Sequence, residues 1–121
     1  RVLFRSGGIQ ASMSQVTRSK PALMQLYESI NNFNTEFSWD KLSTLLGKED
    51  VVQLDQLKAI HCPTLLVAGA EDPLFPEPLL ASYLPFFPAA TLTEVADAGH
   101  SPYFEQPEVF NQTLAGHLQR A

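Results

Sequence analysis

The sequence predicts an α/β fold in which strands of a parallel sheet are flanked by helices, with a helical segment on the N-terminal side. Two observations carry this prediction. The apolar, charge-free run from Thr64 to Ala68 is typical of a strand buried on both faces, as strands of parallel sheets are. From Pro63 onward, strand and helix patterns alternate twice, an order that indicates a right-handed βαβ unit.

The N-terminal half carries helical periodicity. Apolar residues recur at spacings of three and four over Pro21–Asn32, which predicts one helix with Ser19 as its cap. Ser38 can cap a second short helix that carries Trp39 and that Gly47 ends. The small polar residues before Ser19 show no clear period, so no element is predicted there.

The C-terminal half is predicted to contain the remaining elements of the sheet. A short helical turn over Asp55–Ile60 precedes the buried strand. Apolar residues on one face predict a helix over Glu77–Phe86. Thr91–Val95 alternates polar and apolar residues, as a strand nearer the sheet edge does. Pro107 begins the last helix, since proline is well suited to a first helical turn.

Two loops contain the candidate catalytic residues. In a parallel sheet, reactive groups gather in the loops that follow the carboxyl ends of the strands. The acid loop, Gly69–Pro73, contains Asp72, and the histidine loop, Ala96–Ser101, contains His100. Because the two strands are predicted neighbours, the carboxylate and the imidazole can come within hydrogen-bonding range. Such an acid fixes the histidine tautomer and stabilises the imidazolium, so we predict a catalytic acid and base.

Each of these residues also has a purely structural interpretation. Asp72 could be merely a cap of the turn that follows it, and His100 could be an ordinary turn histidine. Glu71 is the fallback acid, although we expect its longer side chain to point to solvent. Asp97 is expected to cap its own loop. Ser101 is expected to cap the next short turn and is not assigned as a nucleophile.

The other histidines and the cysteine are not assigned to the site. Three histidines far apart in sequence, without close paired spacing, argue against a metal site. We expect His61 to be a surface or packing residue and His117 to be solvated on the last helix. Cys62 is expected to be a small buried residue at a strand start. No metal and no cofactor are predicted.

Two segments of the chain resemble the α/β-hydrolase superfamily. Ile60–Pro76 is similar to its seventh strand and acid loop, and Ala98–Asn111 resembles its histidine loop and final helix. The acid precedes the histidine by 28 residues, in the family's chain order. The resemblance implies that residues 57–121 are the C-terminal part of a hydrolase core. It also implies that residues 6–56 hold a strand-end loop and a helical lid.

The nucleophile of such an enzyme is missing from the sequence. The Gly-x-Ser-x-Gly elbow occurs nowhere. Ser6, followed by two glycines, could be mistaken for its end. It lies too close to Asp72, because two strands, a helix and the lid normally intervene. We therefore expect the natural protein to continue upstream. Residues 1–5 resemble the translated end of a sequencing adapter and are excluded from the fold.

The resemblance implies a hydrolase for an ester-like or activated carbonyl bond of a small, mainly apolar substrate, with no cofactor. Esterases and C–C bond hydrolases are the favoured branch. Epoxide hydrolases and dehalogenases with an aspartate nucleophile stay open, because the missing nucleophile decides the reaction class. A non-catalytic ligand receptor on the same fold also stays open.

Composition bears on partners and compartment. The chain of 121 residues is long enough for one domain at most, and its net charge of −5 argues against nucleic acid or an anionic membrane as a partner. No apolar run reaches the roughly 20 residues of a membrane span. A single cysteine permits no internal disulfide and favours a reducing compartment. We therefore expect a cytoplasmic protein whose partner is a small-molecule substrate.

Overall fold

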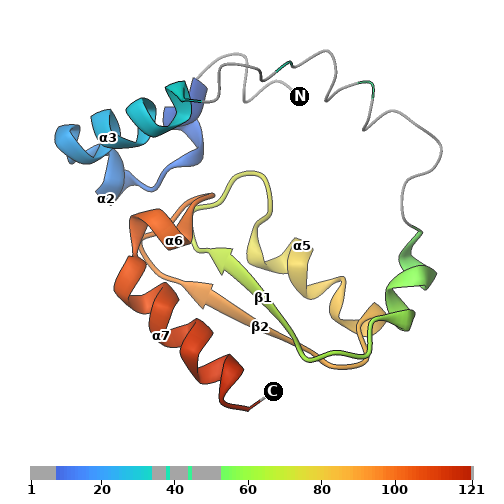
Figure 1. The fold of residues 1–121 in the computed structure, drawn as a ribbon. Coiled ribbons are helices and arrows are strands. Elements are labelled where there is room, and N and C mark those ends of the chain that lie inside the picture. The colour runs from blue at the N-terminus through green and yellow to red at the C-terminus, as the bar shows by residue number, and fades with distance from the viewer. Residues whose placement is uncertain (1–7, 34–37, 39–43, 45–52, 121) are drawn as a thin grey trace.

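The centre of the fold is a pair of parallel strands, β1 (Thr64–Gly69) and β2 (Ala90–Val95). The computed structural model describes residues 8–33, 38, 44 and 53–120 (Figure 1). The pairing runs in register from the first residues of both strands to their last, so Gly69 lies opposite Val95. Both strands therefore end at the same edge of the sheet, and the loops that follow them emerge side by side.

Helices lie against both strands. The crossover consists of α5 (Glu77–Ala81) and the 3-10 helix η3 (Leu84–Phe86), and α5 contacts both strands. After β2, α6 (Pro102–Glu105) contacts β1 and α7 (Pro107–Leu118) contacts β2. In Figure 1, α5 and α7 lie on different sides of the strand pair. The parallel strand–helix–strand unit predicted from the sequence is confirmed.

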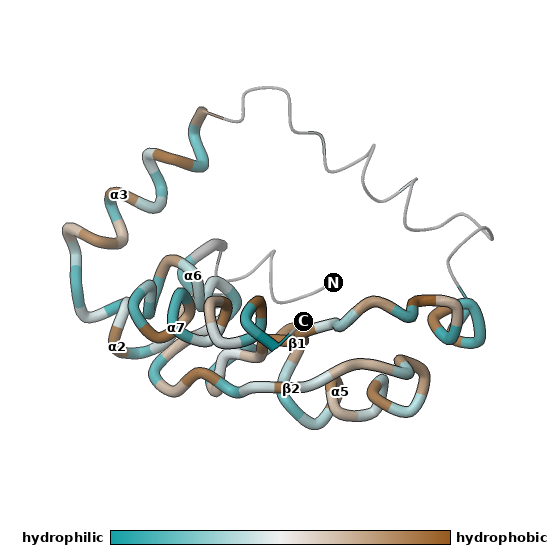
Figure 2. Tube along the Cα trace, turned by 60° about the horizontal axis from the view of Figure 1, so that its bottom comes forward, coloured by the Kyte–Doolittle hydropathy of each residue, from teal (hydrophilic) through white to brown (hydrophobic). Residues whose placement is uncertain are grey.

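The N-terminal helical segment begins with η1 (Gly8–Ser12), α2 (Gln15–Arg18) and α3 (Pro21–Asn32), and η2 (Leu54–Ala59) leads into β1. Ser14 caps α2, because its hydroxyl accepts a 3.1 Å hydrogen bond from the Thr17 N–H. Figure 2 shows brown and teal stretches alternating along α3, as expected of an amphipathic helix. None of the described helices has the length and apolar character required to cross a bilayer.

Several sequence predictions hold and others fail for identifiable reasons. The helix Pro21–Asn32 is confirmed with its predicted bounds, but Ser19 does not cap it; Ser19 ends α2 and its hydroxyl donates to the Val16 carbonyl. The helix predicted over Glu77–Phe86 is divided in two. Pro85 has no N–H to bond the Ala81 carbonyl four residues earlier, and the α-helix ends at Ala81.

Two short helices, α2 and α6, were not predicted from periodicity, because four residues complete barely one turn. The helical turn before β1 is confirmed as η2. The second predicted helix, apart from Ser38 and Thr44, lies outside the described residues, and so does the adapter-like segment 1–5.

The described core concentrates at the carboxyl ends of the strands. Ala68, Val95 and Ala98 are fully buried there, whereas the first four residues of β1 are only half-buried. The predicted burial of this strand therefore holds for Ala68 and Gly69 and is wrong for its first four residues.

Replacing Gly69 by alanine should destabilise the protein by about 3 kcal/mol, a typical upper cost of overpacking. A Cβ at Gly69 would collide with the carbonyl oxygens of Ala98 and Gly99, which are backbone atoms and cannot rotate away. The matched control is Gly116→Ala on α7, whose Cβ would first meet the Arg120 side chain at 3.6 Å. Alanine should stabilise that helix by about 1 kcal/mol. Urea unfolding measures both effects, and a Gly69→Ala midpoint equal to wild type would contradict the prediction.

Candidate active site

Asp72 and His100 face each other across the two strand-end loops. Nδ1 of His100 lies 2.9 Å from Oδ2 of Asp72. The Asp72 side chain is 6% exposed and the His100 side chain 36% exposed, so the acid is buried and the imidazole reaches the surface. Because a carboxylate only accepts hydrogen bonds, Nδ1 is the donor of this bond, and in a neutral imidazole the lone pair then lies on Nε2. The predicted juxtaposition of these side chains is confirmed.

The acid loop itself fixes the Asp72 carboxylate. Oδ1 accepts hydrogen bonds from the N–H groups of Leu74 and Phe75, at 2.8 and 3.2 Å. The turn is closed by the Asp72 N–H, which donates to the Gly69 carbonyl at 3.0 Å. The capping role and the histidine-binding role therefore coexist in one residue. One carboxylate oxygen organises the turn, and the other orients His100.

The main chain of His100 is held by the N-terminal segment. Its N–H donates to the Ser12 carbonyl at 2.7 Å. Gly99 makes this approach possible, because a Cβ at this position would collide with the Ser12 carbonyl oxygen and with Met13. The Phe75 ring stacks on the imidazole, with centroids 5.7 Å apart and planes inclined by 20°. Contacts from two different segments thus restrict both the backbone and the ring of His100.

A buried carboxylate below the histidine loop was not predicted from the sequence. Oε1 of Glu105 accepts hydrogen bonds from the N–H groups of Gly99 and Ser101, at 2.8 and 3.2 Å. Oε2 of Glu105 accepts from the Ser14 N–H at 2.7 Å. Its place on a short helix after the histidine was the only available signal, and that signal is weak. The residue joins the loop around His100 to the N-terminal helical segment.

Helix α3 also contacts the histidine loop. The Tyr27 hydroxyl and the Ser101 hydroxyl form a 2.9 Å hydrogen bond, and the Tyr27 ring packs edge-on against Phe104 at 4.8 Å. Ser101 occupies the N-cap position of α6, but its side chain makes no capping bond there. The expectation that Ser101 caps this turn is therefore wrong, because its hydroxyl is engaged by α3.

Two further acidic residues lie close in sequence to Asp72 and His100 but make other contacts. Glu71 is exposed as expected, yet its Oε2 accepts a 2.8 Å bond from the N–H of Gln15, the first residue of α2. Glu71 therefore binds the start of α2 and does not take the place of Asp72 as the acid. Asp97 has a left-handed backbone with φ of 54°, and its carbonyl accepts from the Gln106 side chain at 3.1 Å. Both residues support the turns around the pair.

The remaining predicted positions lie away from the pair. Cys62 is exposed, so its predicted burial is wrong. It precedes β1 at the amino end, whereas the core gathers at the carboxyl end. His61 is exposed, as the surface interpretation required, and His117 is half-buried where solvation was expected. Within the part of the chain that the structure describes, no group of three potential metal ligands is present.

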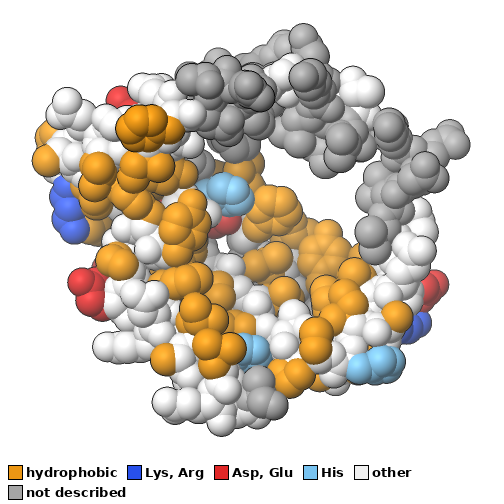
Figure 3. Space-filling view, viewed as in Figure 1, with side chains coloured by type: hydrophobic (Ala, Val, Ile, Leu, Met, Phe, Trp, Pro, Cys, Tyr) orange, Lys and Arg blue, Asp and Glu red, His pale blue; other side chains and the backbone are white. Residues whose placement is uncertain are grey.

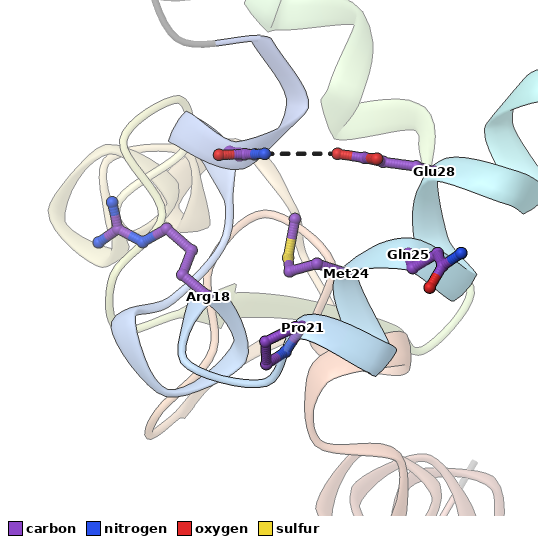
Figure 4. A pocket seen from close by; sticks show the side chains of 6 residues that line it. Arg18, Pro21, Met24, Gln25 and Glu28 are labelled. Carbon is purple, nitrogen blue, oxygen red and sulfur yellow. Dashed lines mark hydrogen bonds between the residues drawn. The ribbon is translucent and has the colours of Figure 1, made fainter.

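A separate cavity of about 300 Å³ lies beside α2 and α3 (Figure 4). Two of its lining residues are joined, because the Gln10 amide donates a 3.4 Å hydrogen bond to Glu28. None of its lining residues comes from the acid or histidine loop, so it is not the space in front of His100. Figure 3 shows instead that hydrophobic side chains gather over much of the visible face, between α3 and α7. The cavity is lined by Gln10, Arg18, Pro21, Met24, Gln25 and Glu28.

Sequence comparison identifies the family. The Alpha/beta hydrolase family matches residues 7–113, so the chain belongs to that family. The pairing of an acid loop with a histidine loop at the ends of neighbouring parallel strands agrees with this assignment. No curated protein matches the sequence.

Solved structures show the same fold. A thermophilic esterase from Thermogutta terrifontis is 33% identical, with a TM-score of 0.53. The matched region covers 55% of this chain and 25% of the esterase chain. Est816, described as an N-acyl homoserine lactone degrading enzyme, is 24% identical over 95% of this chain and 49% of its own, with a TM-score of 0.71. A serine hydrolase involved in carbazole degradation is 18% identical over 93% and 45%, with a TM-score of 0.72. The chain therefore spans between a quarter and a half of these structures.

Replacing Tyr27 by phenylalanine should destabilise the protein by about 1 kcal/mol, the net value of one hydrogen bond. The variant keeps the ring against Phe104 but loses the hydroxyl bond to Ser101. Tyr103→Phe is the matched control, because Tyr103 also packs edge-on against a phenylalanine, Phe110, while 57% of its surface is exposed. Chemical denaturation of both variants measures the difference. Equal losses in the two variants would refute a specific role for the Tyr27 hydroxyl.

Proposed function

We propose that the full-length protein containing this chain hydrolyses an ester-like or activated carbonyl bond of a small molecule. The observation that carries the proposal is the 2.9 Å bond between Nδ1 of His100 and Oδ2 of Asp72, in an acid-then-histidine chain order. Residues that match this arrangement in the alpha/beta hydrolase family serve a nucleophile supplied by an earlier part of the chain. The nucleophile is proposed to be a serine upstream of this sequence.

The pair supplies the proton transfers of such a reaction. Nε2 of His100 accepts the proton of the nucleophile as it attacks, and returns it to the leaving group. In the second half-reaction, the same nitrogen accepts a proton from water. Asp72 stays ionised throughout, holds Nδ1–H and stabilises the imidazolium. Backbone bonds from Leu74 and Phe75 keep the carboxylate in place, so no reorganisation is needed when the charge develops.

Ester-like substrates are favoured by the comparison at 33% identity, which is with an esterase. A mainly apolar substrate is favoured by α3, which we propose as part of a lid. This helix exposes Leu26 and Ile30, and Phe33, which directly follows it, is 84% exposed. Apolar side chains on a helix tied to the histidine loop can cover the acyl part of a substrate. With one cysteine in this chain, we further propose that the protein acts in the cytoplasm.

His100→Ala and Asp72→Asn should each lower kcat for p-nitrophenyl esters by at least about 10⁴-fold, as losses of triad members do. The asparagine can still cap its turn through Oδ1, but its NH₂ group would face Nδ1 and favour the wrong histidine tautomer. His61→Ala is the matched control, because His61 is exposed and lies at the opposite end of β1. It should retain wild-type turnover.

The outcomes of this assay separate the possible reaction classes. Wild-type turnover in His100→Ala would contradict the proposal. Halide release from haloalkanes, or diol formation from epoxides, with no ester turnover would indicate an aspartate nucleophile. Saturable binding of a small ligand without turnover would indicate a receptor. Cleavage of a carbon–carbon bond in a β-diketone, with the same dependence on His100, would place the enzyme in that branch of the family.

Residues 6–121 expressed alone should have no esterase activity and should self-associate. Catalysis by the pair requires the nucleophile and its oxyanion donors, and no Gly-x-Ser-x-Gly elbow is present. Large apolar side chains are exposed, among them Phe33 and Leu118; exposed apolar surface of this kind promotes association. Light scattering and the same ester assay test this. Monomers with a cooperative melt and turnover that depends on His100 would show that a nucleophile lies within this chain.

A further inference from the structure

We propose that Glu105 is a positioning residue, which holds the main chain of His100 from both sides and fixes it to the start of α2. The inference rests on the proposed hydrolase function, in which His100 moves the protons. Glu105 does not touch the imidazole and is not part of the acid–base pair. Its action is through the backbone of the residues that flank the histidine.

The contacts of Glu105 converge on one short stretch of chain. Oε1 receives the N–H groups of Gly99 and Ser101, the residues immediately before and after His100. The N–H of His100 itself points the other way and donates to the Ser12 carbonyl at 2.7 Å. Three consecutive N–H groups of the histidine loop are therefore bound, and the peptide planes on both sides of His100 have fixed orientations.

The second carboxylate oxygen extends this arrangement to a distant segment. Oε2 accepts from the Ser14 N–H at 2.7 Å, across 91 residues of sequence. Ser14 is fully buried and caps α2 with its hydroxyl. Because Ser12 accepts from His100 and Ser14 donates to Glu105, the segment Ser12–Ser14 and the histidine loop are joined by bonds in both directions. A shift of one segment must displace the other.

The chemistry of the donors explains why a carboxylate is required. Glu105 is 4% exposed, and a buried carboxylate is stable only when its oxygens are bound. All three donors are backbone N–H groups, so both oxygens of the side chain must be acceptors. A glutamine has the same size but only one acceptor oxygen. In either orientation its NH₂ group would face a donor, either that of Ser14 or those of Gly99 and Ser101.

The proposal predicts a loss of turnover rather than of substrate binding. Displacement of a catalytic group by about 1 Å can reduce the rate about 100-fold, even when the change lies away from the reacting atoms. The hydrogen bonds of Glu105 go to main-chain N–H groups of the histidine loop and of Ser14, and not to α3, the helix proposed to cover the substrate, so the binding of the ground-state substrate should be preserved. A residue with a purely structural role would instead lower the fraction of folded enzyme and leave kcat per active site unchanged.

The test is Glu105→Gln in the full-length protein, with kcat referred to active sites titrated by an organophosphonate. We expect kcat for a p-nitrophenyl ester to fall about 10- to 100-fold, with KM within about twofold of wild type. The NMR signal of the His100 Nδ1 proton should broaden or shift. Thr17→Val is the matched control. It removes the 3.0 Å bond between the Thr17 and Ser14 hydroxyls, which destabilises the same segment but leaves Glu105 bound.

Each result decides between positioning and structural roles. Wild-type kcat per titrated site in Glu105→Gln, or an equal fall of kcat in Thr17→Val, would overturn the positioning role. If Glu105→Gln does not accumulate as folded protein, Glu105→Asp replaces it. Its shorter carboxylate cannot reach both sets of donors, and the same criteria for kcat and KM apply. Failure of the hydrolase proposal is distinguishable, because the wild-type protein would then show no ester turnover, or His100→Ala would retain it, whatever the Glu105 variants do.

Discussion

The close backbone contact between the acid loop and the histidine loop is the constraint on which the site depends. Hydrogen bonding between the strands continues past their ends, through Ala70 N–H to Val95 O at 2.9 Å and Glu71 N–H to Ala98 O at 2.8 Å. The absence of a side chain at Gly69 permits this approach. Since Asp72 follows directly, the proximity of its carboxylate to the imidazole is a consequence of main-chain pairing, and the side-chain bond adds orientation.

The N-terminal helical segment is part of the site's construction and not only a cover for it. Ser12 and Ser14 bind the histidine loop through their backbones, and Tyr27 binds it through a hydroxyl. The acid loop is attached as well, because Glu71 accepts the N–H of Gln15. Both loops are therefore held on one side by the sheet and on the other by this segment. The segment is therefore anchored beside Asp72 and His100.

The sequence predicts what is local and misses what is distant. The helix Pro21–Asn32 is evident because its apolar residues recur at helical spacings, and the strand Thr64–Ala68 because it is an apolar run without charge. Asp72 and His100 were identifiable because parallel strands bring their carboxyl ends together. Glu105 was not, since no local pattern records that its partner is an N–H 91 residues away. The predicted burial of Cys62 failed because a strand-like run does not reveal which end of the strand lies in the core.

The separation of Glu105 from Ser14 has a consequence for the order in which the molecule acquires its structure. The Asp72–His100 contact closes a loop of 28 residues, whereas the Ser14–Glu105 contact closes one of 91. The longer closure costs about 1 kcal/mol more in chain entropy. Contacts between residues distant in sequence also form late in folding, because contacts between nearer residues close shorter loops and cost less chain entropy. During refolding, parallel strand pairing should therefore return before the histidine loop is anchored to Ser14.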